Sequence, residues 1–169
     1  MKKIKVLISS SKIKNKVNKI AQQINKDFKN KELVVVSVLS GSVVFFSDII
    51  RKLNVDFEID FVRVASYKGK KSSGKIKFLC DTVINLKGKD VLLVEDICDS
   101  GRTLSYIKDL FIKRKANSVK ICTLINKKVE KYKQIKIDYF GFDIDNKFIV
   151  GYGLDYNGKY RGLPYIGVI

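Results

Sequence analysis

The sequence predicts an α/β fold in which a Rossmann-like parallel sheet is flanked by helices, and three observations support this prediction. Apolar runs of strand length recur along the chain, and several are followed by turns and segments with helical spacing. The runs at 33–39 and 91–94 are typical of strands that are buried on both faces. No linker or low-complexity segment divides the 169 residues, a length that suits one domain. We therefore expect a single domain over residues 1–169.

The remaining elements follow from the same periodicities. Apolar residues at helical spacing predict a helix over 12–29, a second over 43–52, and a third that begins after residue 103. Besides the two buried runs, the expected strands are 56–65, 76–79, 119–125, 137–142 and 147–152. The segments at the two ends of the chain look antiparallel, so we expect them to form a small subdomain that caps the parallel sheet.

The most informative stretch of the chain is residues 91–104. Its apolar strand leads to the carboxylates Glu95 and Asp96, where we expect the strand to emerge into solvent. A short polar turn, Asp99 to Thr103, then precedes the third helix. Ligands of open α/β sheets bind at the carboxyl ends of strands, so this stretch is the first candidate for a binding site.

The residue types in this turn indicate an anion site beside a cation site. Ser100, Gly101, Arg102 and Thr103 lie where a helix start exposes backbone N–H groups, which favour a phosphate. The preceding acid pair would repel a phosphorylated ligand unless a hard cation lay between them, which indicates Mg²⁺. The plainer alternative is an ordinary helix start that Asp99 or Ser100 caps, with carboxylates that only mark a solvated strand end.

Composition narrows the function classes. The chain has no histidine, which excludes Ser-His-Asp and Cys-His catalysis and leaves acid–base chemistry to carboxylates, lysines and tyrosines. Its three cysteines form no CxxC pair and indicate free thiols in a reducing compartment. No apolar stretch approaches the roughly 18 residues of a membrane span, and the start has too short an apolar run for a signal peptide. We therefore expect a cytoplasmic protein.

The net charge of +17 is of the kind that nucleic-acid-binding proteins carry. Here, however, the lysines are scattered through every segment instead of forming one basic arm or helix. We interpret most of this charge as a solvated surface whose positive field also attracts a highly anionic substrate.

Two runs of the sequence resemble a known family. The run EDICDSGRTL at 95–104 resembles the phosphoribosyl-pyrophosphate loop of type I phosphoribosyltransferases. The run FIVGYGLDY at 148–156 is similar to FVVGYGLDY of the hypoxanthine (hypoxanthine-guanine) branch of that family, with Ile149 as a mild departure. The resemblance covers nearly the whole chain and implies a Rossmann-like core with a hood over the purine base.

The resemblance implies roles for acidic residues. Asp155 is implied to help hold Mg²⁺, and Glu95 and Asp96 to lie against the ribose hydroxyls and the metal shell. Asp99 is the expected general base, because it is the best-placed candidate in a chain without histidine.

The purine is expected to meet a different set of residues. Lys127 is implied to face the exocyclic oxygen of a 6-oxopurine, Phe148 to stack on its ring, and the Val150 backbone to lie nearby. The complete set of expected substrate contacts is Ser40, Gly41, Ser66, Tyr67, Glu95, Asp96, Asp99, Ser100, Gly101, Arg102, Thr103, Lys127, Phe148, Val150 and Arg161.

Several of these positions carry further expectations. Gly41 belongs to a turn that could bind pyrophosphate through its backbone, and Arg161 is implied to pair with the same group. Ser40 and Lys131 depart from the family, in which many relatives carry a basic residue and an arginine, respectively.

The segment at about 66–76 nearly matches the sequence motif of a nucleotide-binding P-loop. Its last position is Ile76 where a P-loop needs Ser or Thr for Mg²⁺, and the residues after it alternate like a strand. We therefore reject a nucleotide-triphosphate site. The resemblance instead implies a flexible lid in which Ser66 and Tyr67 close over the reacting centre and exclude water.

The function implied by the resemblance is purine salvage. The enzyme would transfer 5-phosphoribosyl from phosphoribosyl pyrophosphate to hypoxanthine, or to guanine or xanthine. Relatives form dimers and tetramers, so a homodimer or homotetramer is expected. The alternatives are a regulatory protein with the same fold that binds RNA and, less favoured, a plain basic nucleic-acid module. A pyrimidine as acceptor base is disfavoured by the run at 148–155.

Overall fold

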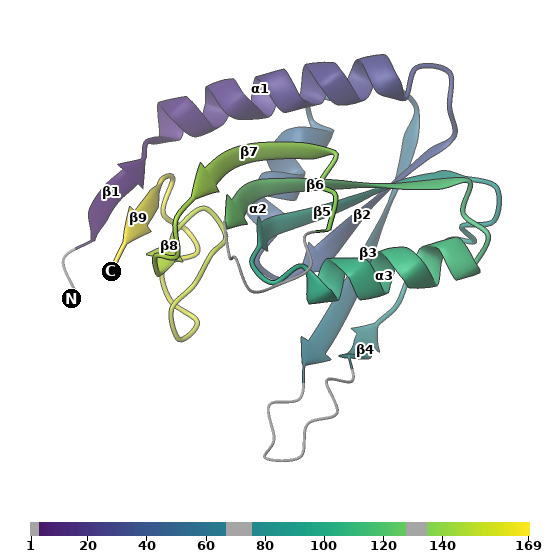
Figure 1. Cartoon of the computed structure of the whole chain (residues 1–169). Coiled ribbons are helices and arrows are strands. Elements are labelled where there is room, and N and C mark those ends of the chain that lie inside the picture. Colours follow the sequence, from purple (N-terminus) through teal and green to yellow (C-terminus); the bar gives the residue numbers. More distant parts are fainter. Residues whose placement is uncertain (1–3, 67–75, 128–134) are drawn as a thin grey trace.

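The central element of the fold is a six-stranded sheet, seen here in a computed structural model that describes residues 4–66, 76–127 and 135–169. The strand order is β4-β3-β2-β5-β6-β7, and every neighbouring pair is parallel except β3 and β4 (Figure 1). The strands are β2 (Leu33–Leu39), β3 (Phe57–Ser66), β4 (Ile76–Cys80), β5 (Asp90–Cys98), β6 (Ser118–Lys127) and β7 (Tyr139–Ile144). The predicted α/β class is confirmed, with an antiparallel edge strand added to the parallel sheet.

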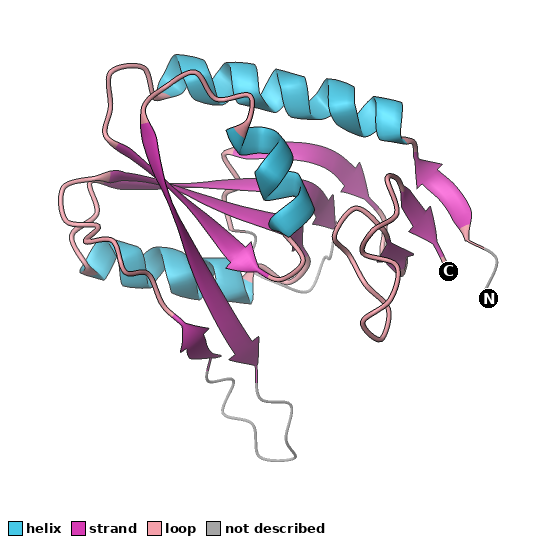
Figure 2. Cartoon of the chain, turned by 180° about the vertical axis from the view of Figure 1, so that it is seen from behind, coloured by secondary structure: helices cyan, strands magenta, loops and turns pink. Residues whose placement is uncertain are grey.

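Helices cover both faces of this sheet (Figure 2). On one face, α1 (Ser10–Asp27) and α2 (Val43–Ile50) bury their apolar sides in one hydrophobic core. On the other face, α3 (Arg102–Lys113) packs Leu104, Ile107 and Phe111 into a second core. Because both faces are buried, the strands between the helices are apolar on both sides, which is the pattern read from the sequence.

The two ends of the chain meet in a second, three-stranded sheet. Strand β9 (Ile166–Val168) pairs antiparallel with β1 (Lys5–Ile8) on one side and with β8 (Ile149–Val150) on the other. This small sheet lies beside the carboxyl ends of the parallel strands (Figure 1). The Tyr152 hydroxyl donates a hydrogen bond to Oδ2 of Asp48 on α2 at 2.5 Å, which fastens the segment after β8 to the helix.

Three sequence expectations need correction. The first helix begins at Ser10 instead of residue 12, because the Ser9 side chain accepts the backbone N–H of Lys12 and caps it. Strand β5 does not end at residue 94; it continues to Cys98, because it stays paired with β6 to that residue. The strand expected over 76–79 runs one residue further, to Cys80, which is exposed on this edge strand β4.

None of the helices in the described part of the chain is both long and apolar enough to cross a membrane.

Candidate active site

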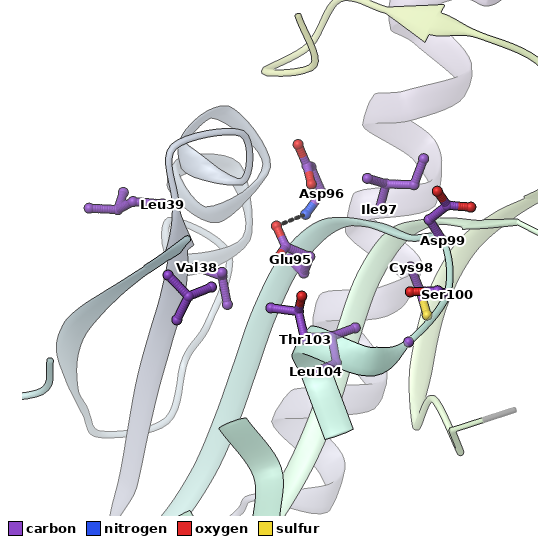
Figure 3. A pocket seen from close by; sticks show the side chains of 12 residues that line it. Val38, Leu39, Glu95, Asp96, Ile97, Cys98, Asp99, Ser100, Thr103 and Leu104 are labelled. Atoms are coloured by element: carbon purple, nitrogen blue, oxygen red, sulfur yellow. Dashed lines mark hydrogen bonds between the residues drawn. The ribbon is translucent and has the colours of Figure 1, made fainter. Parts of the chain in front are cut away.

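The acid pair of β5 forms the floor of the site. Glu95 and Asp96 were expected where the strand emerges into solvent, but both lie inside the paired strand, and Asp96 is buried. The reason is the extension of β5, whose pairing with β6 continues past both residues to Cys98. Glu95 turns back toward its own strand, where its Oε1 accepts the backbone N–H of Asp96 at 3.1 Å (Figure 3).

Burial sets the protonation of this pair. It raises the pKa of Glu95 well above its usual value, and the charge of the adjacent Asp96 raises it further. Burial also raises the pKa of Asp96, although hydrogen bonds from Glu95 and the Ile97 backbone and the charge of Arg161 oppose this effect. The site therefore holds acids that a cation or a set of hydroxyl donors would stabilise in their ionised form.

The turn after β5 leads directly into the N-terminus of α3. The N-cap residue is Gly101, in the left-handed region at φ 71°, and the cap makes no side-chain hydrogen bond. The alternative in which Asp99 or Ser100 caps the helix is therefore wrong. A side chain at Gly101 would press on Ile135, so glycine is needed both for its backbone angle and for space. At this cap no side-chain acceptor competes with an anion for the backbone N–H groups.

A cavity of about 230 Å³ lies between β2, β5 and this turn (Figure 3). Six of the predicted site residues line it, namely Glu95, Asp96, Asp99, Ser100, Gly101 and Thr103. Apolar side chains of Val38, Leu39, Val64, Ile97 and Leu104 complete its wall together with Cys98. The cavity thus combines an acidic floor, hydroxyl groups and a helix N-terminus. Arg102 starts α3 with an exposed side chain outside the lining.

The turn after β2 packs against the acid pair. A Cβ at Gly41 would overlap the Asp96 carboxylate, so the absence of a side chain at Gly41 lets the turn lie against the acid pair. The buried hydroxyl of Ser42 donates to the Val38 carbonyl at 2.5 Å and bonds to Ser37 at 2.7 Å, which fixes the path of the turn. Ser40 lies in this turn, between the end of β2 and the start of α2.

The C-terminal segment contributes an ion pair. Arg161 Nη2 lies 2.7 Å from Asp155 Oδ1, and its Nη1 donates to the Gly153 carbonyl at 2.5 Å. The other oxygen of Asp155 accepts the backbone N–H of Gly158 at 2.7 Å. Asp155 does not line the cavity, but Arg161 acts on Asp96 through its charge and so connects this ion pair with the acid pair.

The residues expected at the purine lie on two elements. Lys127 is the last residue of β6, at the carboxyl edge of the sheet. Phe148 comes directly before β8, is 54% exposed, and meets Tyr156 edge-on with ring centroids 5.4 Å apart. Val150 lies in β8 and is fully buried. None of the three lines the cavity beside the acid pair.

Some expectations fall on parts that the structure leaves out. Tyr67, Lys131 and residues 69–75 of the P-loop-like stretch lie outside the described residues, as does the side chain of Ser66. Ile76 begins strand β4. The helix that a P-loop would require at this point is therefore replaced by a strand, which agrees with the rejection of a nucleotide-triphosphate site.

Comparison with known proteins gives the family. A model described as "Phosphoribosyl transferase domain" matches residues 7–157, most of the chain. The chain belongs to the phosphoribosyltransferase family. Within the family, a hypoxanthine-guanine phosphoribosyltransferase of Streptococcus pyogenes serotype M3 is 45% identical over 166 residues, covering 98% of this chain and 92% of the relative.

Solved structures of phosphoribosyltransferases share the fold. A crystal structure of a hypoxanthine-guanine phosphoribosyltransferase from Bacillus anthracis has a TM-score of 0.91 and 44% identity, and the match covers 99% of both chains. That of a hypoxanthine phosphoribosyltransferase from Staphylococcus aureus has a TM-score of 0.93 and 40% identity, covering 98% of this chain and 90% of that one. The matches give no support to the alternative of an RNA-binding regulatory protein.

The carboxylates of this phosphoribosyltransferase offer a cation hard oxygen ligands. No group of three or more acidic, cysteine or histidine side chains that could hold a metal by themselves occurs in the described ranges. Glu95, Asp96 and Asp155 therefore do not form one protein cage. They suit a cation such as Mg²⁺, which proteins bind through one or two carboxylates together with water and substrate oxygens.

Part of the supporting structure of this phosphoribosyltransferase was not predicted from the sequence. Ser37 and Ser42 hold the turn after β2, and Asp48 receives Tyr152. A signal for Ser37 was available, since it is the polar residue within the otherwise apolar β2. Asp48 carries no such signal, because its partner lies 104 positions away in the sequence.

Proposed function

We propose that this protein is a purine-salvage enzyme. It transfers 5-phosphoribosyl from phosphoribosyl pyrophosphate to hypoxanthine, and to guanine or xanthine if they fit, giving the nucleoside monophosphate and pyrophosphate. The observation that carries the proposal is that the acid pair of β5 and the residues at the N-terminus of α3 line one cavity. The relatives, named as hypoxanthine-guanine phosphoribosyltransferases over nearly the whole chain, support the same reaction.

The phosphate cradle positions the donor. In the proposed complex the 5′-phosphate binds at the start of α3, where Ser100 to Thr103 offer backbone N–H groups and two hydroxyls. The ribose hydroxyls then lie over Glu95 and Asp96, which accept their hydrogen bonds. This contact favours the ionised form of acids whose pKa is raised in the free protein.

The leaving pyrophosphate lies between the turn after β2 and the C-terminal segment. We propose that the backbone of Ser40 and Gly41 binds it on one side and Arg161 on the other. Bound Mg²⁺, held with the help of Asp155 and the acid pair, would supply positive charge for the leaving group. Because Asp155 and Arg161 pair with each other in the free protein, substrate binding has to exchange that ion pair for contacts with the ligand.

The chemical step needs alignment and one proton acceptor. The bond from the ribose carbon to pyrophosphate breaks, and a bond to the purine nitrogen forms at the same carbon. Positive charge develops on the ribose, beside the carboxylates of the floor. The exposed Asp99 accepts the proton that leaves the purine ring, as general base.

The choice of base rests on the two purine-side elements. Lys127, at the end of β6, would donate to the exocyclic oxygen of a 6-oxopurine and would meet an unfavourable amino group in adenine. Phe148 is exposed enough to stack on the ring, and the Val150 backbone would face the base edge.

Further proposals concern the domain, the cellular location and the assembly of the protein. We propose that residues 1–169 form one phosphoribosyltransferase domain, in which the sheet of β1, β9 and β8 is the hood and residues 66–76 form the lid. We also propose that the protein is cytoplasmic, acts on small-molecule substrates and assembles as a homodimer or homotetramer.

A direct assay tests the proposal. The protein is incubated with phosphoribosyl pyrophosphate, Mg²⁺ and one of hypoxanthine, guanine, xanthine, adenine or a pyrimidine, and the nucleotides are identified. Formation of inosine monophosphate and pyrophosphate in equal amounts is expected, with little product from adenine. Absence of nucleotide with every 6-oxopurine would refute the proposal. Salt-sensitive RNA binding without base-dependent pyrophosphate release would favour the regulatory alternative instead.

A further inference from the structure

A buried hydroxyl behind the acid pair has no partner. Thr123 lies in β6 with no exposed surface, and its Oγ1 makes no hydrogen bond within the described part of the chain. It is alone in this among the buried side-chain polar atoms of those residues. A buried hydroxyl without a partner is destabilising, so its presence at this position calls for a function.

The position of Thr123 in the sheet shows which side chains it can meet. Its neighbours Cys122 and Leu124 belong to the core beneath α1 and α2, so Thr123 faces the opposite side, toward α3. Strand register places it directly across from Glu95 on β5 and from Phe140 on β7. Phe140 offers no acceptor, whereas Glu95 offers a carboxylate.

The apolar character of this face leaves few other partners. The α3 side chains buried against it are Leu104, Ile107 and Phe111, none of which can accept a hydrogen bond. Parallel strands lie about 4.8 Å apart, and directly opposed residues point to the same face. A Glu95 carboxylate that swings toward β6 therefore reaches the Thr123 hydroxyl.

Glu95 lines the cavity, and its hydrogen bonds go to Asp96, the next residue of its own strand. The backbone hydrogen bond that it accepts comes from the next residue of its own strand, at 3.1 Å. Such a bond holds the side chain back against β5 and does not aim it at a ligand. A donor on the neighbouring strand would define the carboxylate position from the side.

We propose that Thr123 is a positioning residue for Glu95. In the substrate-bound enzyme its hydroxyl donates a hydrogen bond to the Glu95 carboxylate and holds it toward the ribose hydroxyls of phosphoribosyl pyrophosphate. Thr123 does not touch the substrate; it acts through Glu95. The inference rests on the proposed function, in which Glu95 binds the ribose.

The test uses Thr123→Val, which removes the hydroxyl at nearly constant shape, and Thr123→Ser, which retains it. Loss of a hydrogen bond to a charged group corresponds to roughly a tenfold effect or more, so Thr123→Val should raise the KM for phosphoribosyl pyrophosphate about tenfold. The KM for hypoxanthine should stay within about twofold, because the purine is bound by other residues. Thr123→Ser should restore the wild-type KM.

The melting temperature distinguishes a positioning role of Thr123 from a packing role. Because valine places a methyl group where the hydroxyl has no partner, the melting temperature of Thr123→Val should equal or exceed that of the wild type. The matched control is Ile121→Val, which alters packing on the same face of the same strand. It should lower the melting temperature slightly and leave the KM for phosphoribosyl pyrophosphate unchanged.

Each other outcome is decisive. An unchanged KM for phosphoribosyl pyrophosphate in Thr123→Val overturns the inference, and so does a Thr123→Ser variant as impaired as the valine variant. A lower melting temperature with equal losses in all kinetic constants shows a packing role only. An inactive wild type refutes the proposed function instead. Calorimetric titration of both variants with phosphoribosyl pyrophosphate and Mg²⁺ still tests the inference in that case.

Discussion

Two groups of carboxylates in this protein have opposite environments. Away from the cavity, Asp81 and Asp27 are each matched with donors from distant parts of the chain. Within the cavity, Glu95 and Asp96 lie side by side on one strand. Hydrogen bonds from Arg114 lower the pKa of Asp81, whereas burial raises the pKa of both Glu95 and Asp96.

The matched acids have a clear structural role. Arg114, which follows α3, holds both oxygens of Asp81 at 2.7 and 2.5 Å and so connects the segment after β4 with the helix. Asp27 at the end of α1 accepts from the Tyr139 hydroxyl at 2.6 Å and from Lys120 at 2.9 Å, and these bonds lower its pKa. Each acid joins two elements, and its charge is balanced within the protein.

The difference between these environments shows which carboxylates are left for a ligand to neutralise. Carboxylates that hold the fold are satisfied by basic or hydroxyl donors of the protein, while the two of the cavity floor share a hydrogen bond and the charge of Asp96 opposes ionisation of Glu95. Asp155 and Arg161 are an intermediate case, since they are matched with each other within the proposed site. Substitutions at the two groups should therefore have effects of different kind and sign.

The largest effect is expected from Asp99→Ala, which removes the proposed general base. Turnover should fall by about 100-fold or more, while the Kd for phosphoribosyl pyrophosphate stays within about threefold. Steady-state kinetics and calorimetry measure the two quantities. Asp109→Ala, an exposed acid farther along α3, serves as the control and should change neither. Equal losses in turnover and binding would remove the base assignment.

Lys127→Ala extends the comparison to a cation. Lys120 is balanced by Asp27, whereas Lys127 pairs with no acid among the residues that the structure describes. The variant should lose roughly tenfold in its preference for hypoxanthine over adenine, because a donor to the exocyclic oxygen is gone. The ratio of kcat/KM for the two bases is measured, with Lys89→Ala, which removes a cation paired with Glu58, as control. Unchanged discrimination would count against the role of Lys127.

Asp81→Asn should destabilise the fold by roughly 1 kcal/mol at pH 7, the upper range for a partly exposed ion pair. Because the folded-state pKa of Asp81 is lowered, its contribution is present above the unfolded value of about 3.9 and is lost as pH falls through the folded pKa. Denaturation of the wild type and of Asp81→Asn between pH 7 and pH 2 should show that the difference in their free energies of unfolding disappears in acid. A constant gap would show that the charge of Asp81 is not involved.

Glu95→Gln should change the stability of the fold in the opposite direction, and its effect should be the smallest of the four. The folded-state pKa of Glu95 is raised, so its contribution is complete below the unfolded value of about 4.3 and is lost as pH rises through the folded pKa. The variant stays neutral and should melt above the wild type at pH 8, with the gap narrowing toward pH 4. Melting below the wild type at pH 8 would contradict the contrast between the two groups of acids.

The sequence predicted the local parts of the fold well. Residues 33–39 were predicted as a strand and form β2 without a shift, because an apolar run between turn residues needs no distant information. The predicted order of strand, turn and helix over 91–104 was also confirmed, but the predicted end of the strand was wrong. The length of β5 depends on its pairing with β6, which no local pattern shows.

The sequence by itself determined the α/β class, the family and the residue types that gather after β5, because these depend on composition and on order along a short stretch. Only the tertiary structure decided that Gly41 lies against Asp96, that Arg161 pairs with Asp155, and that Thr123 lies across from Glu95. The physical reason is that strand register and close packing bring together residues far apart in the chain, and the charge balance of a site is set by those neighbours.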